Sequence, residues 1–297
     1  MYIIQHRTLF FWITGVILTA AISSILIFGL PIGIDFTGGS MVQVRYDERP
    51  ALSDIQERAA AVPVGAILVR AFGEDGVSVR TRTLSQEEHD ALLVALSSYA
   101  PATEMSFTSI GPTLGSQFAD KALWAVLAVV FVIVLYIAFA FRKVSRPVPS
   151  WGYGLTVVAM LIIDIIVPTG FFAAFAHYTG AEVDSLFIVA LLALLGYVVN
   201  DIIVIFDRVR EHLSRNEREG VREDFEITIG KSIYETITRS INTSLTTAFV
   251  LIAIIFLGAE ATRNFALVML VGVVAGAFSS ITRSAPLLIP IAKWFNK

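Results

Sequence analysis

The sequence of 297 residues contains no cysteine and only four histidines. Without cysteine the chain has no disulfide, no thiol nucleophile and no Cys-ligated metal. The histidines, His6, His89, His177 and His212, lie far apart and lack the spacing of a zinc site. No Ser–Lys, His–Glu or paired-Asp arrangement stands at a spacing that suits catalysis. We therefore expect no metal, no other cofactor and no enzymatic activity.

Charge is also scarce. Charged residues make up 16% of the chain and hydrophobic residues 56%. A soluble globular protein carries about 25% charged residues, so the composition predicts an integral membrane protein. The net charge of -3 gives no indication of nucleic-acid binding.

Six apolar runs are long enough to cross a bilayer as helices. The first is expected to be an uncleaved anchor, because it exceeds the roughly 7–15 residues of a signal core and no A-x-A site follows it. The six predicted spans are Leu9–Leu30, Ala122–Phe141, Gly152–Ala176, Ser185–Phe206, Ile241–Leu257 and Phe265–Ile291.

Basic residues in the short loops predict the orientation of these spans. The second connection contains Arg142, Lys143 and Arg146, and the fourth contains six basic residues, whereas the third, His177–Asp184, has none. We expect both termini in the cytoplasm, and residues 31–119 on the outer side of the cytoplasmic membrane.

Residues 31–119 carry the pattern of a small α+β domain, set between residues 1–30 and the spans of residues 120–297. Apolar and polar residues alternate in the strands, as at Val42 and Val44, and Gly73–Gly76 is typical of a tight turn. The order βαββαβ predicts a ferredoxin-like domain on a polytopic α-helical membrane protein. The predicted strands are Ser40–Tyr46, Ala66–Phe72, Val77–Thr83 and Met105–Ile110, and the predicted helices are Ala51–Ala61 and Gln86–Tyr99.

One carboxylate, Asp201, lies inside the fourth span, where a charge costs roughly 3 kcal/mol. It stands about 25 Å from the outer end of its helix, and Arg239 stands about 10 Å from the cytoplasmic end of the next. Because both depths fall in the cytoplasmic half of the membrane, we expect the two side chains to pair. Such a pair either takes part in proton transfer or permanently locks two helices together.

Two further charges stand in predicted spans. Asp164 lies about 20 Å into the third span, and Pro168 removes the backbone hydrogen bond to its carbonyl. Asp164 either joins a proton relay or sits protonated in a helix contact. Arg283, in the sixth span, is expected to extend toward the interface rather than to pair with Asp207 or Asp201.

The segment GIDFTGGS, Gly33–Ser40, follows the first span. It lacks the Lys-Ser/Thr ending of a phosphate-binding loop, and no helix pattern follows it. We expect Gly38 and Gly39 to shape the turn from the membrane into the first strand, and Asp35 to cap or bond the backbone. A direct role of Asp35 in substrate handling is the alternative.

Four segments together resemble the SecF family, the smaller membrane subunit of the SecDF protein-export complex in the RND superfamily. They are GIDFTGGS (33–40), IGPTLG (110–115), GYVVNDIIVIFDRVRE (196–211) and SIYETITRSINTSLTT (232–247). The resemblance covers nearly the whole chain, including six spans and one exported domain.

The resemblance implies an auxiliary subunit of the Sec translocase that works with SecD beside the SecYEG channel, and with YajC, on a translocating preprotein in the lipid bilayer. It implies use of the proton motive force, with Asp201 and Arg239 at the positions that the family associates with protons. Asp164 is supported less directly, because Ile163 stands where the family often has His. A further carboxylate is expected from SecD.

On this view, protonation of Asp201 weakens its pairing with Arg239, and the last three helices repack. The motion then reaches the exported domain through Ile110–Asp120. Two rival functions stay open: a small-molecule or ion transporter of the same superfamily, and a passive scaffold in which the ion pair is structural.

Overall fold

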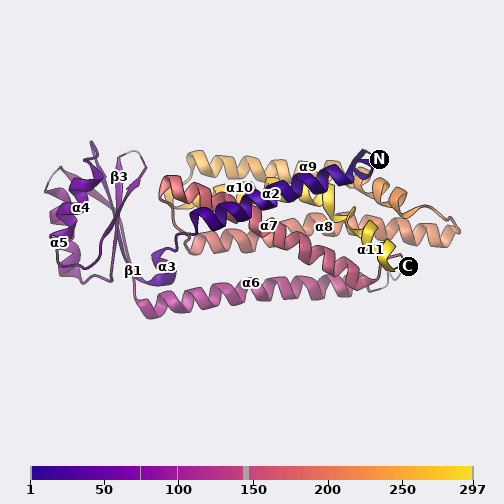
Figure 1. Ribbon diagram of the computed structural model, residues 1–297, viewed down its shortest axis with the longest axis horizontal. Helices are drawn as coiled ribbons and strands as arrows, with labels where there is room; N and C mark the ends of the chain where they lie inside the picture. The colour runs from indigo at the N-terminus through magenta and orange to yellow at the C-terminus, as the bar shows by residue number, and fades with distance from the viewer. Residues whose placement is uncertain (1, 74, 99, 143–146, 296–297) are drawn as a thin grey trace. The chain divides into compact units, whose positions relative to one another are not determined.

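The structure is a computed structural model that describes residues 2–73, 75–98, 100–142 and 147–295 (Figure 1). The sequence predictions made at Glu74, Tyr99, Lys143 and Arg146 lie outside these residues. The chain divides into two compact units. A helical unit comprises residues 1–29, 125–172 and 186–297, and an α+β unit comprises residues 30–124 together with 173–185.

Within the described residues, six helical segments are long and apolar enough to cross a membrane, as predicted. The chain is therefore a multi-pass membrane protein. A short helix, α1 (Tyr2–Gln5), precedes them. The spanning segments are α2 (Arg7–Phe28), α6 (Pro112–Ala140), α7 (Ser150–Thr179), α8 (Ser185–Glu219), α9 (Phe225–Leu257) and the run Ala261–Phe295, which contains most of α10 (Glu260–Ser279), η1 (Ser280–Ser284) and α11 (Leu288–Phe295).

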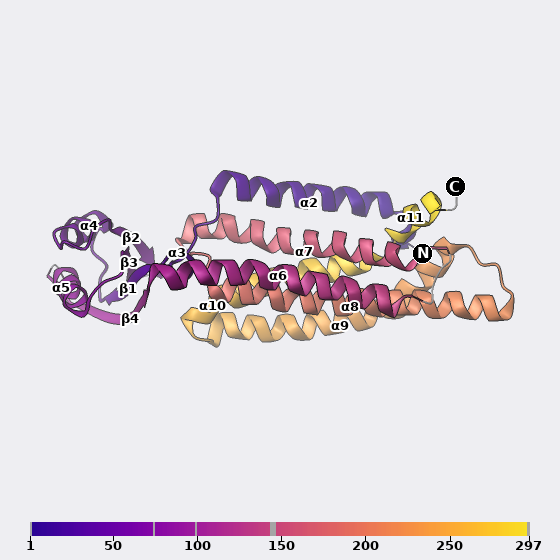
Figure 2. The same ribbon diagram turned by 90° about the horizontal axis from the view of Figure 1, so that it is seen from below.

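The spanning helices are buried to very different extents. Half of the most apolar stretch of α7 and of α8 is buried inside the protein, against 11% in α2, 6% in α6 and 17% in α9. The axes of the long helices are roughly aligned in both views (Figure 1, Figure 2). In the run Ala261–Phe295 half of the most apolar stretch is buried as well, so this run, α7 and α8 form the centre of the helical unit. Helices α2, α6 and α9 leave apolar side chains for lipid or for another protein.

Close helix contacts depend on glycine. A Cβ atom on Gly170 of α7 would lie 2.5 Å from the backbone of Ala21 in α2. The Ser24 hydroxyl donates to the Gly170 carbonyl at 2.7 Å across the same contact. In α10, Gly272 and Gly276 lie against Leu194 and Val198 of α8. Small residues at these positions let the backbones approach, as in other membrane helix pairs.

The α+β unit contains one four-stranded antiparallel sheet among its described residues, in the order β2-β3-β1-β4 (Figure 2). This order and the alternation of helices and strands confirm the predicted ferredoxin-like arrangement. The elements are α3 (Ile34–Thr37), β1 (Gly39–Tyr46), α4 (Leu52–Ala60), β2 (Leu68–Phe72), β3 (Gly76–Thr81), α5 (Gln86–Ser97) and β4 (Ala102–Ile110).

One face of the sheet forms the core, with Val42 and Val79 fully buried beneath the helices. Helix α5 begins with a capping box between Ser85 and Glu88. The Arg82 guanidinium also bonds the Glu88 carboxylate, and this hydrogen bond, with the Ser85 backbone N–H, lowers the pKa of Glu88 to about 2. The ionised form of Glu88 therefore belongs to the native state of the domain.

Candidate functional site

Asp201 lies in the middle of α8 and its side chain is buried. The Ser280 hydroxyl, on η1, donates to its Oδ2 at 3.4 Å. A carboxylate inside an apolar helix is costly unless it meets a counter-charge, water or a proton. Among the described residues this weak contact is the one hydrogen bond to the carboxylate that meets geometric criteria, and Ser240 and the charge of Arg239 on α9 are near enough to act on it as well.

The expected ion pair between Asp201 and Arg239 does not form among the described residues. Arg239 is exposed on α9, while the next residue, Ser240, is fully buried. Consecutive residues differ by about 100° around a helix, so the depth estimate gave the height of Arg239 and left its direction open. The two side chains form no ion pair at contact distance in the described part of the chain, although the charge of Arg239 still acts on Asp201.

Arg239 instead lines a cavity of about 520 Å³ between the end of α6 and the middle parts of α8 and α9. Asp207, Arg208 and Glu235 also line it, so its wall is rich in charge. Charged side chains of this kind are hydrated. Arg239 therefore faces a polar opening, and Ser240 faces the protein interior.

Asp164, unlike Asp201, lies beside an opposite charge. Its Oδ1 lies 4.0 Å from Nη2 of Arg283, and the two side chains are only 2% and 6% exposed. The expectation that Arg283 extends to the interface was wrong. Arg283 lies in η1, a π-helical turn; such turns widen a helix locally and redirect side chains. The Asp164 carboxylate then offsets part of the cost of burying the guanidinium.

Several polar atoms around these two carboxylates have no hydrogen-bond partner among the described residues. They are both carboxylate oxygens of Asp164, the hydroxyls of Ser240 and Ser279, and Nε of Arg283. Native proteins leave very few buried polar groups unpaired. Such atoms can be satisfied by a bound proton, by water or by a second arrangement of the side chains. Each of these changes the charge or the contacts inside the membrane.

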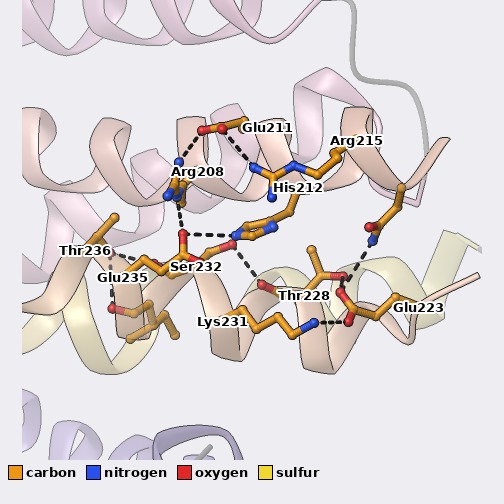
Figure 3. A network of polar contacts seen from close by, with 12 residues as sticks. Arg208, Glu211, His212, Arg215, Glu223, Thr228, Lys231, Ser232, Glu235 and Thr236 are labelled. Atoms are coloured by element: carbon orange, nitrogen blue, oxygen red, sulfur yellow. Dashed lines mark hydrogen bonds and ion pairs between the residues drawn. The ribbon is translucent and has the colours of Figure 1, made fainter. Parts of the chain in front are cut away.

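A second polar network joins α8 to α9 beyond the apolar part of both helices (Figure 3). Glu235 accepts from Nε of Arg208, and its Oε2 lies 3.2 Å from Nε2 of the buried His212. Arg208 also bonds Glu211. In the loop that follows α8, Glu223 accepts a hydrogen bond from Lys231, and this bond holds the pKa of the Glu223 carboxyl below its usual range. The network sets the register of the two helices that carry Asp201 and Arg239.

The turn after the first span lies in the α+β unit. Gly38 and Gly39 have φ angles of 73° and 121°, which side-chain-bearing residues rarely adopt. A Cβ on Gly38 would lie 2.7 Å from Pro112, and one on Gly39 would lie 2.6 Å from the Thr81 carbonyl oxygen. Asp35 bonds the backbone of a residue remote in sequence: its Oδ2 accepts from the Ser185 N–H at 2.8 Å.

Sequence reasoning missed three contacts at these sites. Both Arg283 and Asp164 were recognised as charges in predicted spans, but their contact was not predicted. The contact of His212 with Glu235 was not predicted: Glu235 lies in the segment 232–247, but nothing in the sequence indicates that it meets His212. The contact between Asp35 and Ser185 joins residues 150 positions apart, and no local pattern reports such a separation.

Comparison with protein families gives two matches along the chain. Residues 93–294 match the family described as protein export membrane protein SecD/SecF, C-terminal. Residues 23–48 match the SecD/SecF GG motif, which includes Gly38 and Gly39. Together they cover the turn after α2 and the five later spanning segments.

Among curated relatives, the protein translocase subunit SecF of Thermobaculum terrenum is 33% identical, over 99% of this chain and 94% of that protein. The SecF subunit of Anaerolinea thermophila is 32% identical, over 97% and 92%. Among solved structures, the SecDF protein of Thermus thermophilus superposes with a TM-score of 0.85 at 26% identity. The match covers 100% of this chain and 39% of that one.

A further solved structure, described as SecDF in a super-membrane-facing form, matches with a TM-score of 0.66, again at 26% identity. The sequence matches to the two SecF subunits extend over nearly the whole length of this chain and of each subunit. The fold is shared with the solved SecDF structures. The chain therefore belongs to the SecF family of protein translocase subunits and has a role in protein export.

Proposed function

We propose that this chain is an auxiliary subunit of the Sec translocase that, with SecD, uses the proton motive force to promote preprotein movement at the SecYEG channel. The observation that carries the proposal is Asp201, a carboxylate buried in α8 with one weak hydroxyl contact. Intramembrane carboxylates of this kind usually mark ion paths. Asp201 is the group that gains and loses the proton.

Arg239 is the counter-charge in this proposal. An arginine stays protonated at any relevant pH, so only Asp201 of the two titrates. The arrangement described here, with Asp201 unpaired and Arg239 facing the polar cavity, corresponds to neutral Asp201. Loss of the proton creates a negative charge on α8 that attracts the guanidinium on α9.

The membrane potential supplies enough free energy for such a step. A potential of 100 mV makes about 2.3 kcal/mol available for each charge that crosses the full field. About 1.4 kcal/mol changes an equilibrium tenfold, so one proton biases two conformations by roughly fifty-fold. A bias of this size makes forward movement of a preprotein strongly favoured over backsliding.

The two SecDF structures support a conformational cycle. Both are 26% identical to this chain, yet their TM-scores are 0.85 and 0.66. One of the two is described as a super-membrane-facing form, a description that distinguishes one arrangement from another. We propose that protonation of Asp201 shifts the equilibrium between such arrangements.

Orientation and partners follow from charge and length. Arg208, Arg215 and Lys231 belong to the connection that the positive-inside rule assigns to the cytoplasm, which puts the α+β unit on the outer side. The chain spans 39% of the SecDF chain it matches, so we propose a separate SecD as its partner. The exposed apolar sides of α2, α6 and α9 supply surface for SecD and for lipid.

The experiment is export by a reconstituted complex of this chain with SecD and SecYEG, measured with and without a proton gradient. Asp201→Asn is expected to abolish the gradient-driven component. Glu217→Gln is the control, because it neutralises a carboxylate on the same helix at an exposed residue that does not line the cavity of Arg239. Full gradient-driven export by Asp201→Asn contradicts the proposal.

A passive scaffold is the second candidate, and the buried pair of Asp164 and Arg283 favours it. This pair joins α7 to the last spanning segment and can hold helices without moving protons. The scaffold predicts that replacing Asp201 and Arg239 together with neutral residues leaves export intact. The proton-coupled subunit predicts loss of the gradient-driven component in the same double variant.

A further inference from the structure

The connection between α7 and α8 is bound to the segment that follows α2, and both belong to the α+β unit. The Gly33 N–H donates to the Val183 carbonyl at 2.8 Å, and the Val183 N–H donates to the Pro31 carbonyl at 2.8 Å. Ile32 and Val183 form a parallel β-bridge. This short loop is thus fixed by its backbone rather than left free.

Glu182 adds a charged contact beside this bridge. Nη1 of Arg70, on β2, lies 3.3 Å from its Oε1, and Nη1 of Arg80, on β3, lies 3.2 Å from its Oε2. Arg80 also donates to the Ile32 carbonyl at 2.8 Å and to the Thr37 hydroxyl at 2.6 Å. One carboxylate on the loop is therefore held by two neighbouring strands of the sheet.

Asp35 makes a third contact of this kind, at the start of α8. Its carboxylate accepts from the N–H of Ser185, the first residue of that helix. The first N–H groups of a helix have no partner within the helix, and a negative charge there is favourable. The cap is supplied by the segment after α2, so that segment is attached to the beginning of the helix that carries Asp201.

We propose that Asp35, Arg70, Arg80, Glu182 and Val183 form a clasp that transmits movement between α8 and the sheet of the α+β unit. The proposal rests on the proposed function and adds the route by which a charge change at Asp201 reaches the exported domain. The clasp stays closed throughout the cycle. The clasp acts in addition to the covalent route through Ile110–Asp120. Asp35 and Glu182 act as positioning residues of the clasp.

Breaking the clasp tests the route. In the full chain reconstituted with SecD and SecYEG, Glu182→Ala and Asp35→Ala are expected to lower the gradient-driven component of export about fivefold, the change that one ion pair or cap supports. Export without a gradient is expected to stay unchanged. Asp35→Asn keeps an acceptor for the Ser185 N–H and is expected to retain stimulation. Glu57→Ala, at an exposed residue of α4, is the control.

A disulfide distinguishes transmission from a general loss of stability. Because the chain has no cysteine, the pair Ile32→Cys and Val183→Cys introduces one bond, between two residues that already form a bridge. Oxidation is expected to leave gradient-driven export unchanged, and to restore it in the Glu182→Ala background. The proposal is overturned if oxidation of the double-cysteine variant abolishes gradient-driven export while oxidation of either single-cysteine variant does not. That result shows that the clasp must open.

Asp201→Asn is measured in parallel to separate two kinds of failure. If Asp201→Asn abolishes the gradient-driven component while Glu182→Ala and Asp35→Ala keep it in full, the clasp is wrong and the proposed function stands. If Asp201→Asn keeps the gradient-driven component, the proposed function itself fails, and the clasp falls with it.

Discussion

Arg283 and Asp164 form a buried ion pair between the last spanning segment and α7, with Nη2 and Oδ1 4.0 Å apart. Moving both charges out of water is expensive, and their attraction recovers only part of that expense. Removing one partner is worse than removing both, because it leaves an uncompensated charge in the protein interior. The pair therefore makes the two residues depend on each other.

Arg283→Leu is expected to destabilise the protein by about 3–5 kcal/mol, because the Asp164 carboxylate loses its counter-charge. Adding Asp164→Asn is expected to recover much of the loss. Thermal unfolding of the detergent-purified variants measures both effects. Arg215→Leu is the control, since its partly exposed pair with Glu211 should contribute no more than about 1 kcal/mol. Equal loss in the single and double variants contradicts the mutual dependence.

Gly170→Ala is expected to destabilise the protein by about 1–3 kcal/mol, because the new Cβ would stand 2.5 Å from the backbone of Ala21 and force α2 away from α7. Gly154→Ala, in the same helix, meets no atom within 4 Å. It is expected to be neutral or to stabilise by up to about 1 kcal/mol. Thermal unfolding in detergent compares the two, and equal effects would contradict the close contact of α2 with α7.

The stability of α5 is expected to depend on the charge of Glu88. The hydrogen bond from Arg82 lowers the pKa of Glu88 from 4.5 to about 2. A carboxyl with a lowered native pKa stabilises the fold above its unfolded pKa, and this contribution is lost as the pH falls from about 4.5 to about 2. Stability therefore decreases with acid in this window.

Amide hydrogen exchange in α5, corrected for the intrinsic effect of pH, measures this contribution. Glu88→Gln keeps a side chain that completes the capping box but cannot be ionised. We expect wild type to be more protected than Glu88→Gln above pH 4.5, and the two to converge toward pH 2. Glu87→Gln, one residue away, is the control. A constant difference across the range contradicts the role of the charge.

The elements of the fold were largely predictable from periodicity and length. Strand β1 (Gly39–Tyr46) begins only one residue before the predicted strand. The prediction was close because the alternation of buried and exposed residues is a local property of the sequence. Helix α8 begins at the predicted Ser185 but runs to Glu219 instead of Phe206. Hydropathy reports only the part of a helix that lies in lipid, and the polar extension is held by contacts with α9, as in Figure 3.

The contacts of the charged side chains were not predictable in the same way. Depth arithmetic placed Asp201 and Arg239 at similar heights, but the direction of a side chain depends on how each helix is rotated against its neighbours. Arg283 meets Asp164 because η1 interrupts the regular helix, and a local π-turn has no sequence signal as clear as a hydrophobic period. The contact of Glu182 with Arg70 depends on a fold in which residues 112 positions apart meet.

The direction of Arg239 gives a final prediction, which the absence of cysteine makes easy to test. Arg239 lines the cavity of about 520 Å³, while Ser240 is fully buried. Arg239→Cys is therefore expected to react with a membrane-impermeant maleimide added from the cytoplasmic side, and Ser240→Cys is expected to stay unlabelled. Labelling of Ser240→Cys alone means that α9 is rotated differently in the membrane, so that Arg239 faces the interior. Labelling of both residues means that Ser240 is open to water and contradicts its burial. Labelling of Arg239→Cys only from the outer side would instead reverse the proposed orientation.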